Sequence, residues 1–173
     1  MPWRVPVAVA DIAETGEHMN LAADAETRAA IARVAALRDL PRLAASFDLL
    51  PQSGGGLRVT GRVSATVGQT CVVTLEPLTN EVEEEINLLY MPSAAAAAAD
   101  DESEAEIEPK WGEPEPLIAG TVDLGVLATE FLILGLDPYP RKPGAVFEGP
   151  RDDRPEPGPF ADLAGLMKNR NGS

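Results

Sequence analysis

The chain has 173 residues, of which 45% are hydrophobic, with a single cysteine and a single histidine. This length favours one domain with appendages, and the apolar content excludes wholesale disorder. The formal net charge is −14, from 28 acidic and 14 basic side chains. Such a charge repels phosphate backbones, so we expect no DNA binding and no tight nonspecific binding of RNA.

The single cysteine, Cys71, excludes an intramolecular disulfide and favours a reducing compartment. No apolar run approaches the roughly 18 residues that a membrane-spanning helix needs. Residues 1–6 lack the pattern of a secretory signal peptide. We therefore expect a cytoplasmic protein with no membrane partner.

The first 40 residues predict two short strands and a helix. Hydrophobic alternation over residues 3–9 predicts a strand, and Pro6 favours an edge position for it. A second strand is predicted around Met19 and Leu21, after an exposed turn that contains His18. A helix is predicted from the N-cap Asp24 to about residue 38. Its buried face is predicted to consist of Ala30, Ile31, Val34 and Leu37.

Residues 42–90 alternate with a period of two, which predicts antiparallel strands with one buried face. The clearest strand is residues 57–67, after a glycine-rich loop at 51–56. A turn is predicted at 68–70 and a returning strand at 71–75. A last strand carries Glu81, Glu83 and Glu85 outward. The fold class is therefore α+β, with an antiparallel meander that could close, wholly or in part, into a barrel-like sheet.

Acidic residues concentrate in one part of the chain. The range 81–115 holds 12 acids and one base, so the remainder is nearly neutral. Residues 93–120 combine an alanine run with alternating acids and prolines, and few large apolar groups are present to offset the entropy of ordering. We expect an acidic, disordered loop between an α+β region at 1–92 and a C-terminal region at 121–173, within one domain.

The C-terminal region predicts a second helix from the N-cap Asp123 to about Leu136, stopped by Pro138. A proline-rich stretch follows. Near the end of the chain, apolar residues at helical spacing predict a short docking helix. These residues are Phe160, Leu163, Ala164 and Met167.

The residue types offer no obvious catalytic or metal-binding set. One histidine and one cysteine cannot assemble a zinc cluster, and the carboxylates lack calcium-loop spacing. Cys71 falls on the apolar face of the predicted strand, which favours an inert packing role over a reactive thiolate. We therefore expect no enzyme activity and no cofactor. Arg58 and Arg62 project from the polar face of one strand, where they either contact RNA or, as the favoured reading, pair with Glu83 and Glu85.

Three blocks in order resemble the YceD family of bacterial and plastid proteins. The first comprises residues 59–61, 69–71 and 75–77. The second comprises residues 122–124 together with Glu130, Leu134, Leu136 and 138–140. The third is residues 159–166. An acidic low-complexity segment between the first two blocks is also typical of the family.

This resemblance implies a role in accumulation or processing of large-subunit ribosomal RNA, with no established catalytic residues. The family gene often lies beside that of a large-subunit ribosomal protein, which makes a role in assembly of that subunit plausible. Many relatives carry further cysteines after the second block, where a metal could bind, whereas this chain has Arg141, Lys142, Pro143 and Gly144 there. We therefore expect no metal site.

Two hypotheses follow for the partner. In the first, the acidic segment binds a basic ribosomal protein or assembly factor and thereby stabilises RNA indirectly. In the second, RNA contacts the face that carries Arg58 and Arg62, with the acidic loop as a shield. The candidate binding residues from both hypotheses and from the family blocks are Arg58, Arg62, Cys71, Glu102, Glu104, Glu106, Asp123 and Glu130.

Overall fold

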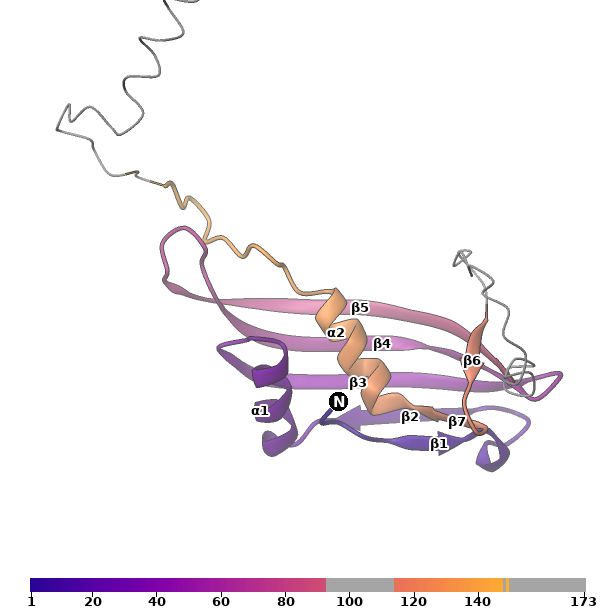
Figure 1. The fold of residues 1–173 in the computed structure, drawn as a ribbon. Helices are drawn as coiled ribbons and strands as arrows, with labels where there is room; N and C mark the ends of the chain where they lie inside the picture. The colour runs from indigo at the N-terminus through magenta and orange to yellow at the C-terminus, as the bar shows by residue number, and fades with distance from the viewer. Residues whose placement is uncertain (93–113, 148, 150–173) are drawn as a thin grey trace, which may run out of the picture.

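The computed structural model describes residues 1–92, 114–147 and 149. Its centre is a five-stranded sheet with the strand order β2-β3-β4-β5-β6 (Figure 1). These strands are β2 (Glu17–Ala22), β3 (Asp39–Gln52), β4 (Gly56–Thr70), β5 (Pro77–Pro92) and β6 (Glu115–Leu117). Strands β2 to β5 are antiparallel to one another in that order, and β6 runs parallel to β5. The expected α+β class is confirmed.

Two helices and a small second sheet cover one face of this sheet (Figure 1). The helices are α1 (Ala25–Val34) and α2 (Leu124–Leu134), and a 3-10 turn, η1, spans Val9–Asp11. Strands β1 (Pro6–Ala8) and β7 (Thr121–Asp123) pair with each other to form the second sheet. Within residues 1–92 and 114–147, β2 and β6 do not pair with each other, so the large sheet does not close and the closed-barrel alternative is wrong.

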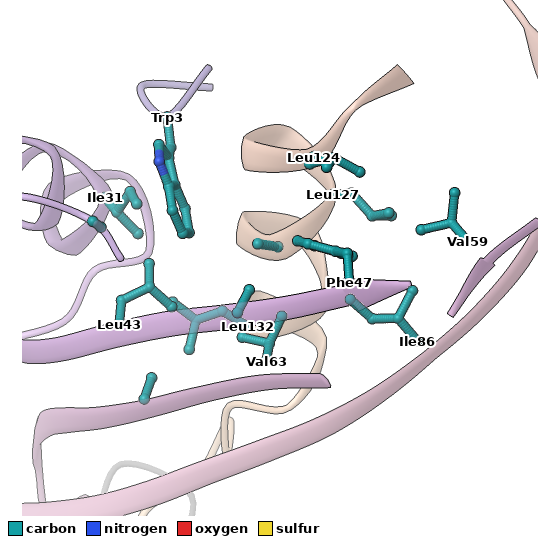
Figure 2. Close-up of a cluster of buried hydrophobic side chains, with 14 of the residues drawn as sticks. Trp3, Ile31, Leu43, Phe47, Val59, Val63, Ile86, Leu124, Leu127 and Leu132 are labelled. Carbon is teal, nitrogen blue, oxygen red and sulfur yellow. The ribbon is translucent and has the colours of Figure 1, made fainter. Parts of the chain in front are cut away.

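The core lies between the large sheet and the helices. Alternating residues of β3 and β4 are buried on the inner face, because successive side chains in a strand point to opposite sides. Figure 2 shows Phe47 and Ile86 from the sheet close to Leu127 and Leu124 of α2, with Trp3 beside Ile31 of α1. Four of the core side chains are fully buried, namely Phe47, Ile31, Leu124 and Leu132. The predicted buried face of residues 57–67 is confirmed.

Both predicted N-caps are present. The Asp24 carboxylate accepts the N–H of Thr27 at 2.7 Å, and the Asp123 carboxylate accepts the N–H of Val126 at 3.1 Å. Each cap satisfies a backbone donor that the first helical turn leaves unpaired. Helix α1 ends at Val34, four residues before the predicted end. It stops there because Ala36 takes a left-handed backbone conformation with φ 53°, and Leu37 then donates its N–H to the carbonyl of Ala32. Val34 is exposed, contrary to the prediction.

The predicted position of the turn between β4 and β5 is also wrong. Strand β4 continues through the predicted turn at 68–70 to Thr70, and the reversal uses residues 71–76, where a returning strand was expected. Gly68 serves close packing, since a Cβ there would lie 2.3 Å from the Asp39 carboxylate. The reversal is closed by the Leu75 N–H, which donates to the Cys71 carbonyl, and by the Cys71 N–H, which donates to the Glu76 carbonyl.

Two further predictions need correction or lie outside the described residues. His18 is part of β2 and not of a turn, although it is exposed as expected. Strand β6 extends the large sheet into the range 93–120, which the sequence analysis assigned to one loop. The rest of the acidic loop, 93–113, and the predicted docking helix at 160–167 lie outside the described residues.

Candidate binding surfaces

The face of the large sheet opposite the helices, here called the open face, is covered by no described element (Figure 1). It presents the outward side chains of β2–β5, and strand register places them in rows across the sheet. One row contains His18, Asp48, Thr60 and Asn87, and the next contains Asn20, Ser46, Arg62 and Glu85. The open face is therefore a flat polar surface that several strands build together.

The arginines of the open face are already hydrogen bonded to neighbours on the sheet. Arg62 lies 2.5 Å from the Glu83 carboxylate and 3.5 Å from the Glu85 carboxylate. Arg58 instead donates to the neutral side-chain oxygen of Asn87 at 2.7 Å. The predicted pairing with Glu83 and Glu85 is thus confirmed for Arg62, whereas Arg58 has no acidic partner among the described residues.

A third arginine of the open face, Arg42, bonds to Glu81 at 3.1 Å and to the Ser64 hydroxyl. The hydroxyl of Thr66 and the Arg42 guanidinium hold the pKa of Glu81 below its usual range. Arginines of β3 and β4 therefore bond to glutamates of β5. No described residue on this face is a tryptophan, tyrosine or phenylalanine, because Phe47 and Tyr90 both lie on the inner-facing register.

His18 has partners on both ring nitrogens. Its Nδ1 lies 2.7 Å from the Asp48 carboxylate, and its Nε2 lies 3.1 Å from the Asn20 side-chain nitrogen. The hydrogen bond that the Asp48 carboxylate accepts from the imidazole raises the pKa of His18, with the charge of Asp48 and the Asn20 contact adding to the increase. Because neither nitrogen is left without a partner, His18 is poorly placed to act as a general base.

Cys71 lies at the start of the turn between β4 and β5, and its side chain is buried. Its sulfur accepts the N–H of Thr74 at 3.4 Å and the N–H of Lys142 at 3.3 Å. The Thr74 side chain, followed by these two N–H groups, lowers the pKa of Cys71 to about 6. Hydrogen bonds to a thiolate favour the charged form, so this sulfur differs electrostatically from the inert packing residue that the sequence suggested.

The same turn carries an exposed apolar cluster. Leu75 has a left-handed backbone with φ 60°, and 77% of its surface is exposed. The N–H of Val72 donates to the carbonyl of Pro140, which brings Tyr139 to the same place. Val72 and Tyr139 are also exposed. A large apolar residue held exposed in an unfavourable backbone conformation is unusual, so the turn is a candidate contact surface.

The remaining described candidates lie near α2. Asp123 caps α2 and also accepts the Val5 N–H at 2.9 Å, while Arg4 pairs with it at 3.3 Å. Burial raises the pKa of Asp123, but the Val5 and Val126 N–H groups and Arg4 outweigh this and lower it overall. These contacts give Asp123 a structural role that ties the N-terminal strand to α2.

Glu130 is exposed on α2 and shares its surroundings with Tyr90 of β5. Burial raises the pKa of Tyr90 to about 12, with the negative charges of Glu115 and Glu130 adding to the increase. Carboxylates from α2 and β6 therefore flank one half-buried phenol. Glu102, Glu104 and Glu106 lie outside the described residues. The structure thus brings Arg58 and Arg62 together on one face and places Cys71, Asp123 and Glu130 elsewhere.

Two features are absent from the described residues, a metal-binding cluster and a membrane-spanning helix. No group of three or more histidine, cysteine, aspartate and glutamate side chains in 1–92 and 114–147 is arranged to hold a metal ion. Among those same residues, neither helix has the length and apolarity required to cross a membrane.

A comparison with protein-family models matches residues 59–166 to the family described as large ribosomal RNA subunit accumulation protein YceD. The match spans more than half of the chain. The chain belongs to the YceD family. No curated protein and no solved structure matches it. The YceD match includes most of β4, all of β5 and α2, and the turn that contains Cys71, whereas β2, β3 and α1 precede it.

Sequence reasoning missed the two donors around the Cys71 sulfur. Thr74 is three residues from Cys71, a spacing that fits a tight turn, but the predicted strand at 71–75 concealed it. Lys142 is 71 residues away, and no local pattern could have indicated that contact. Lys142 also pairs with Glu76 at 3.0 Å, which adds a second link between the turn and the chain after α2.

Proposed function

We propose that this chain supports accumulation of large-subunit ribosomal RNA as a cytoplasmic, non-enzymatic accessory factor that binds a basic ribosomal or assembly protein. The observation that carries the proposal is the location of the charge. Residues 100–115 hold eight acids and one base, whereas the arginines Arg42 and Arg62 of the open face are bonded to acids of β5. Negative charge thus dominates one segment, and such a field attracts basic proteins.

The acidic segment is attached to the sheet at both ends. It begins after Pro92, the last residue of β5, and it ends at β6, which pairs with β5. Tyr90 and Glu115 are partners in that pairing, so the two points at which the segment is attached to the sheet lie side by side. A basic protein bound to the acids would therefore be held near the β5–β6 edge, close to Glu115 and Glu130.

A charge-neutralising variant tests this proposal. Glu102, Glu104 and Glu106, together with Asp100, Asp101 and Glu108, are changed to their amides, which keeps the length of the segment. We expect ribosomal proteins to co-purify with the wild type and to be largely lost from the variant. The matched control replaces Glu81, Glu83 and Glu85 of the sheet with glutamine and should keep its partners. Unchanged recovery with the first variant contradicts the proposal.

The second candidate function is direct RNA binding through the open face, and the environment of Arg58 is the observation that favours it. Arg58 bonds to neutral Asn87 and has no acidic partner among the described residues, so its positive charge is available there. The open face, however, offers no tryptophan, tyrosine or phenylalanine ring in its described part for a base to stack on, and the imidazole of His18 is bonded to Asp48 and Asn20. We therefore favour protein binding by the acidic segment over RNA binding by the open face.

A further inference from the structure

A groove runs between α1 and the start of β3, and its lining includes three arginines and one acid, Asp39. Its volume is about 480 Å³. Its floor is made by small or apolar residues, among them Ala29, Ala32 and Leu40, and its rim carries Arg28, Arg33 and Arg38. We call it the α1 groove. An apolar floor with a cationic rim suits a peptide that has apolar side chains on one side and carboxylates beside them.

The three arginines keep donors available for such a peptide. Arg28 uses one guanidinium nitrogen to bond to the Ala23 carbonyl at 2.6 Å, and Arg38 uses its Nε for Asp39 at 2.9 Å. Arg33 makes no side-chain hydrogen bond or ion pair with any described residue. A guanidinium carries five N–H donors, so two arginines are partly used and one is unused.

We infer that the α1 groove binds the chain's own C-terminal tail, residues 150–173. The tail has four acids and four bases, so it is neutral overall, but all four acids lie between 152 and 162, where Arg154 is the one base. Phe160, Leu163, Ala164 and Met167 follow at the spacing of one helix face. The tail therefore combines large apolar groups for the alanine floor with carboxylates for the arginine rim.

The fold places the start of the tail near the groove. The Arg38 N–H, at one end of the groove, donates to the Gly68 carbonyl of β4, and Val72, just after β4, donates to Pro140. Four residues separate Gly68 from Val72, which limits that distance to about 14 Å. The twenty residues between Pro140 and Phe160 span this distance several times over. Figure 1 shows α1 and the chain after α2 at the same end of the sheet.

The acidic segment fits the groove less well than the tail does. It is anchored where Tyr90 pairs with Leu57, eleven residues along β4 from Gly68, or roughly 36 Å away. A 21-residue segment that is tied at both ends extends at most about 35 Å from its anchors. Its large apolar side chains are Ile107 and Trp111, fewer than the tail has to cover the floor.

Disulfide trapping in the full-length chain tests this inference. Ala29→Cys in the groove is combined with Ala164→Cys in the tail, and formation of the intramolecular disulfide under mild oxidation is followed by mass spectrometry. The matched controls pair Ala164→Cys with Ser64→Cys on the open face and with Leu75→Cys in the exposed turn. Ala164→Cys alone measures any reaction with the buried Cys71. Melting curves of every variant verify that the fold is kept.

We expect the groove pair to close about tenfold faster than either control pair, because a docked tail has a higher local concentration than a freely tethered one. Adding Arg33→Glu to the groove pair should remove most of that advantage. Equal rates for all pairs, faster closure at Leu75, or a disulfide mainly between two chains at low protein concentration would each overturn the inference. None of these outcomes depends on ribosomal partners, so the result is separate from that of the proposed function.

Discussion

The backbone N–H of Lys142 donates to the sulfur of Cys71 at 3.3 Å and so joins two residues that are 71 positions apart. Two neighbouring contacts support this link. Val72 donates its N–H to the Pro140 carbonyl at 2.9 Å, and the Gln69 side chain donates to the Asp137 carbonyl at 2.9 Å. The chain after α2 is therefore fastened along the end of β4, and the sulfur acts there as a hydrogen-bond acceptor.

The ionisation of Cys71 provides the first prediction. Hydrogen bonds from Thr74 and Lys142 lower its pKa to about 6, so its thiolate absorbance should titrate with a midpoint near that pH. Because the folded pKa lies below the unfolded one, ionisation favours folding fully above about pH 9, and this contribution is lost as pH falls through about 6. Wild type should therefore gain stability over Cys71→Ser between pH 6 and 9. A midpoint near 8.5, with no such gain, would show that the hydrogen bonds do not stabilise the thiolate.

Asp123 provides the second prediction. Asp123→Ala removes the N-cap of α2 and leaves the Val5 and Val126 N–H groups without their acceptor. We expect the free energy of unfolding to fall by about 1–2 kcal/mol at pH 7, as measured by urea denaturation. The folded pKa of Asp123 is lowered, so the difference should persist above about pH 4 and shrink as pH falls further.

The matched control for Asp123 is Asp24→Ala, which removes the other N-cap. Asp24 is exposed and its carboxylate bonds to Thr27 and Glu26, both in the first turn of its own helix, so its loss should cost less than that of Asp123. Equal losses for the two variants would argue that the contact between Asp123 and Val5 does not contribute.

Gly61 provides the third prediction. A Cβ at this position of β4 would lie 2.1 Å from the backbone oxygen of Ser46 in β3, so the backbone itself would have to move. We expect Gly61→Ala to lower the free energy of unfolding by about 1–3 kcal/mol. Ser64→Ala, on the open face of the same strand, should stay within about 0.5 kcal/mol of wild type. A neutral Gly61→Ala would show that β3 and β4 can separate more easily than their register implies.

The open face provides the fourth prediction. If the acidic segment is the main contact, the double variant Arg58→Glu, Arg62→Glu should keep its RNA and protein partners in pull-downs from cells. Arg62 is exposed and paired with Glu83 and Glu85, so breaking these surface ion pairs should change stability by only about 0–1 kcal/mol. Loss of RNA from a folded double variant would instead support direct RNA binding through Arg58.

The long strands and both N-caps could be predicted from the sequence, because their signals are local. A half-buried strand shows a period of two, and Asp24 and Asp123 stand directly before helical patterns. The pairing of Arg62 with acids was likewise predictable, since all three side chains fall on one face of adjacent strands.

Other features depend on contacts that no local pattern records. The sequence predicts a turn at Gly68, but it remains in β4, where it pairs with Asp39 of β3 and Thr79 of β5. Strand β6 has only three residues, including Pro116, which is too short to show a period. The partner of the Cys71 sulfur, Lys142, and the position of the α1 groove both follow from the tertiary arrangement of distant segments.

Crosslinking in living cells tests the central claim most directly, that the acidic segment engages a basic protein. Wild type and the variant in which the six acids between 100 and 108 are changed to amides are crosslinked and purified under denaturing conditions. The captured material is then sorted into protein and RNA. We predict that wild type captures basic ribosomal or assembly proteins in excess over RNA, and that neutralising the acids removes them. Capture of mainly RNA, retained after neutralisation, would contradict this account.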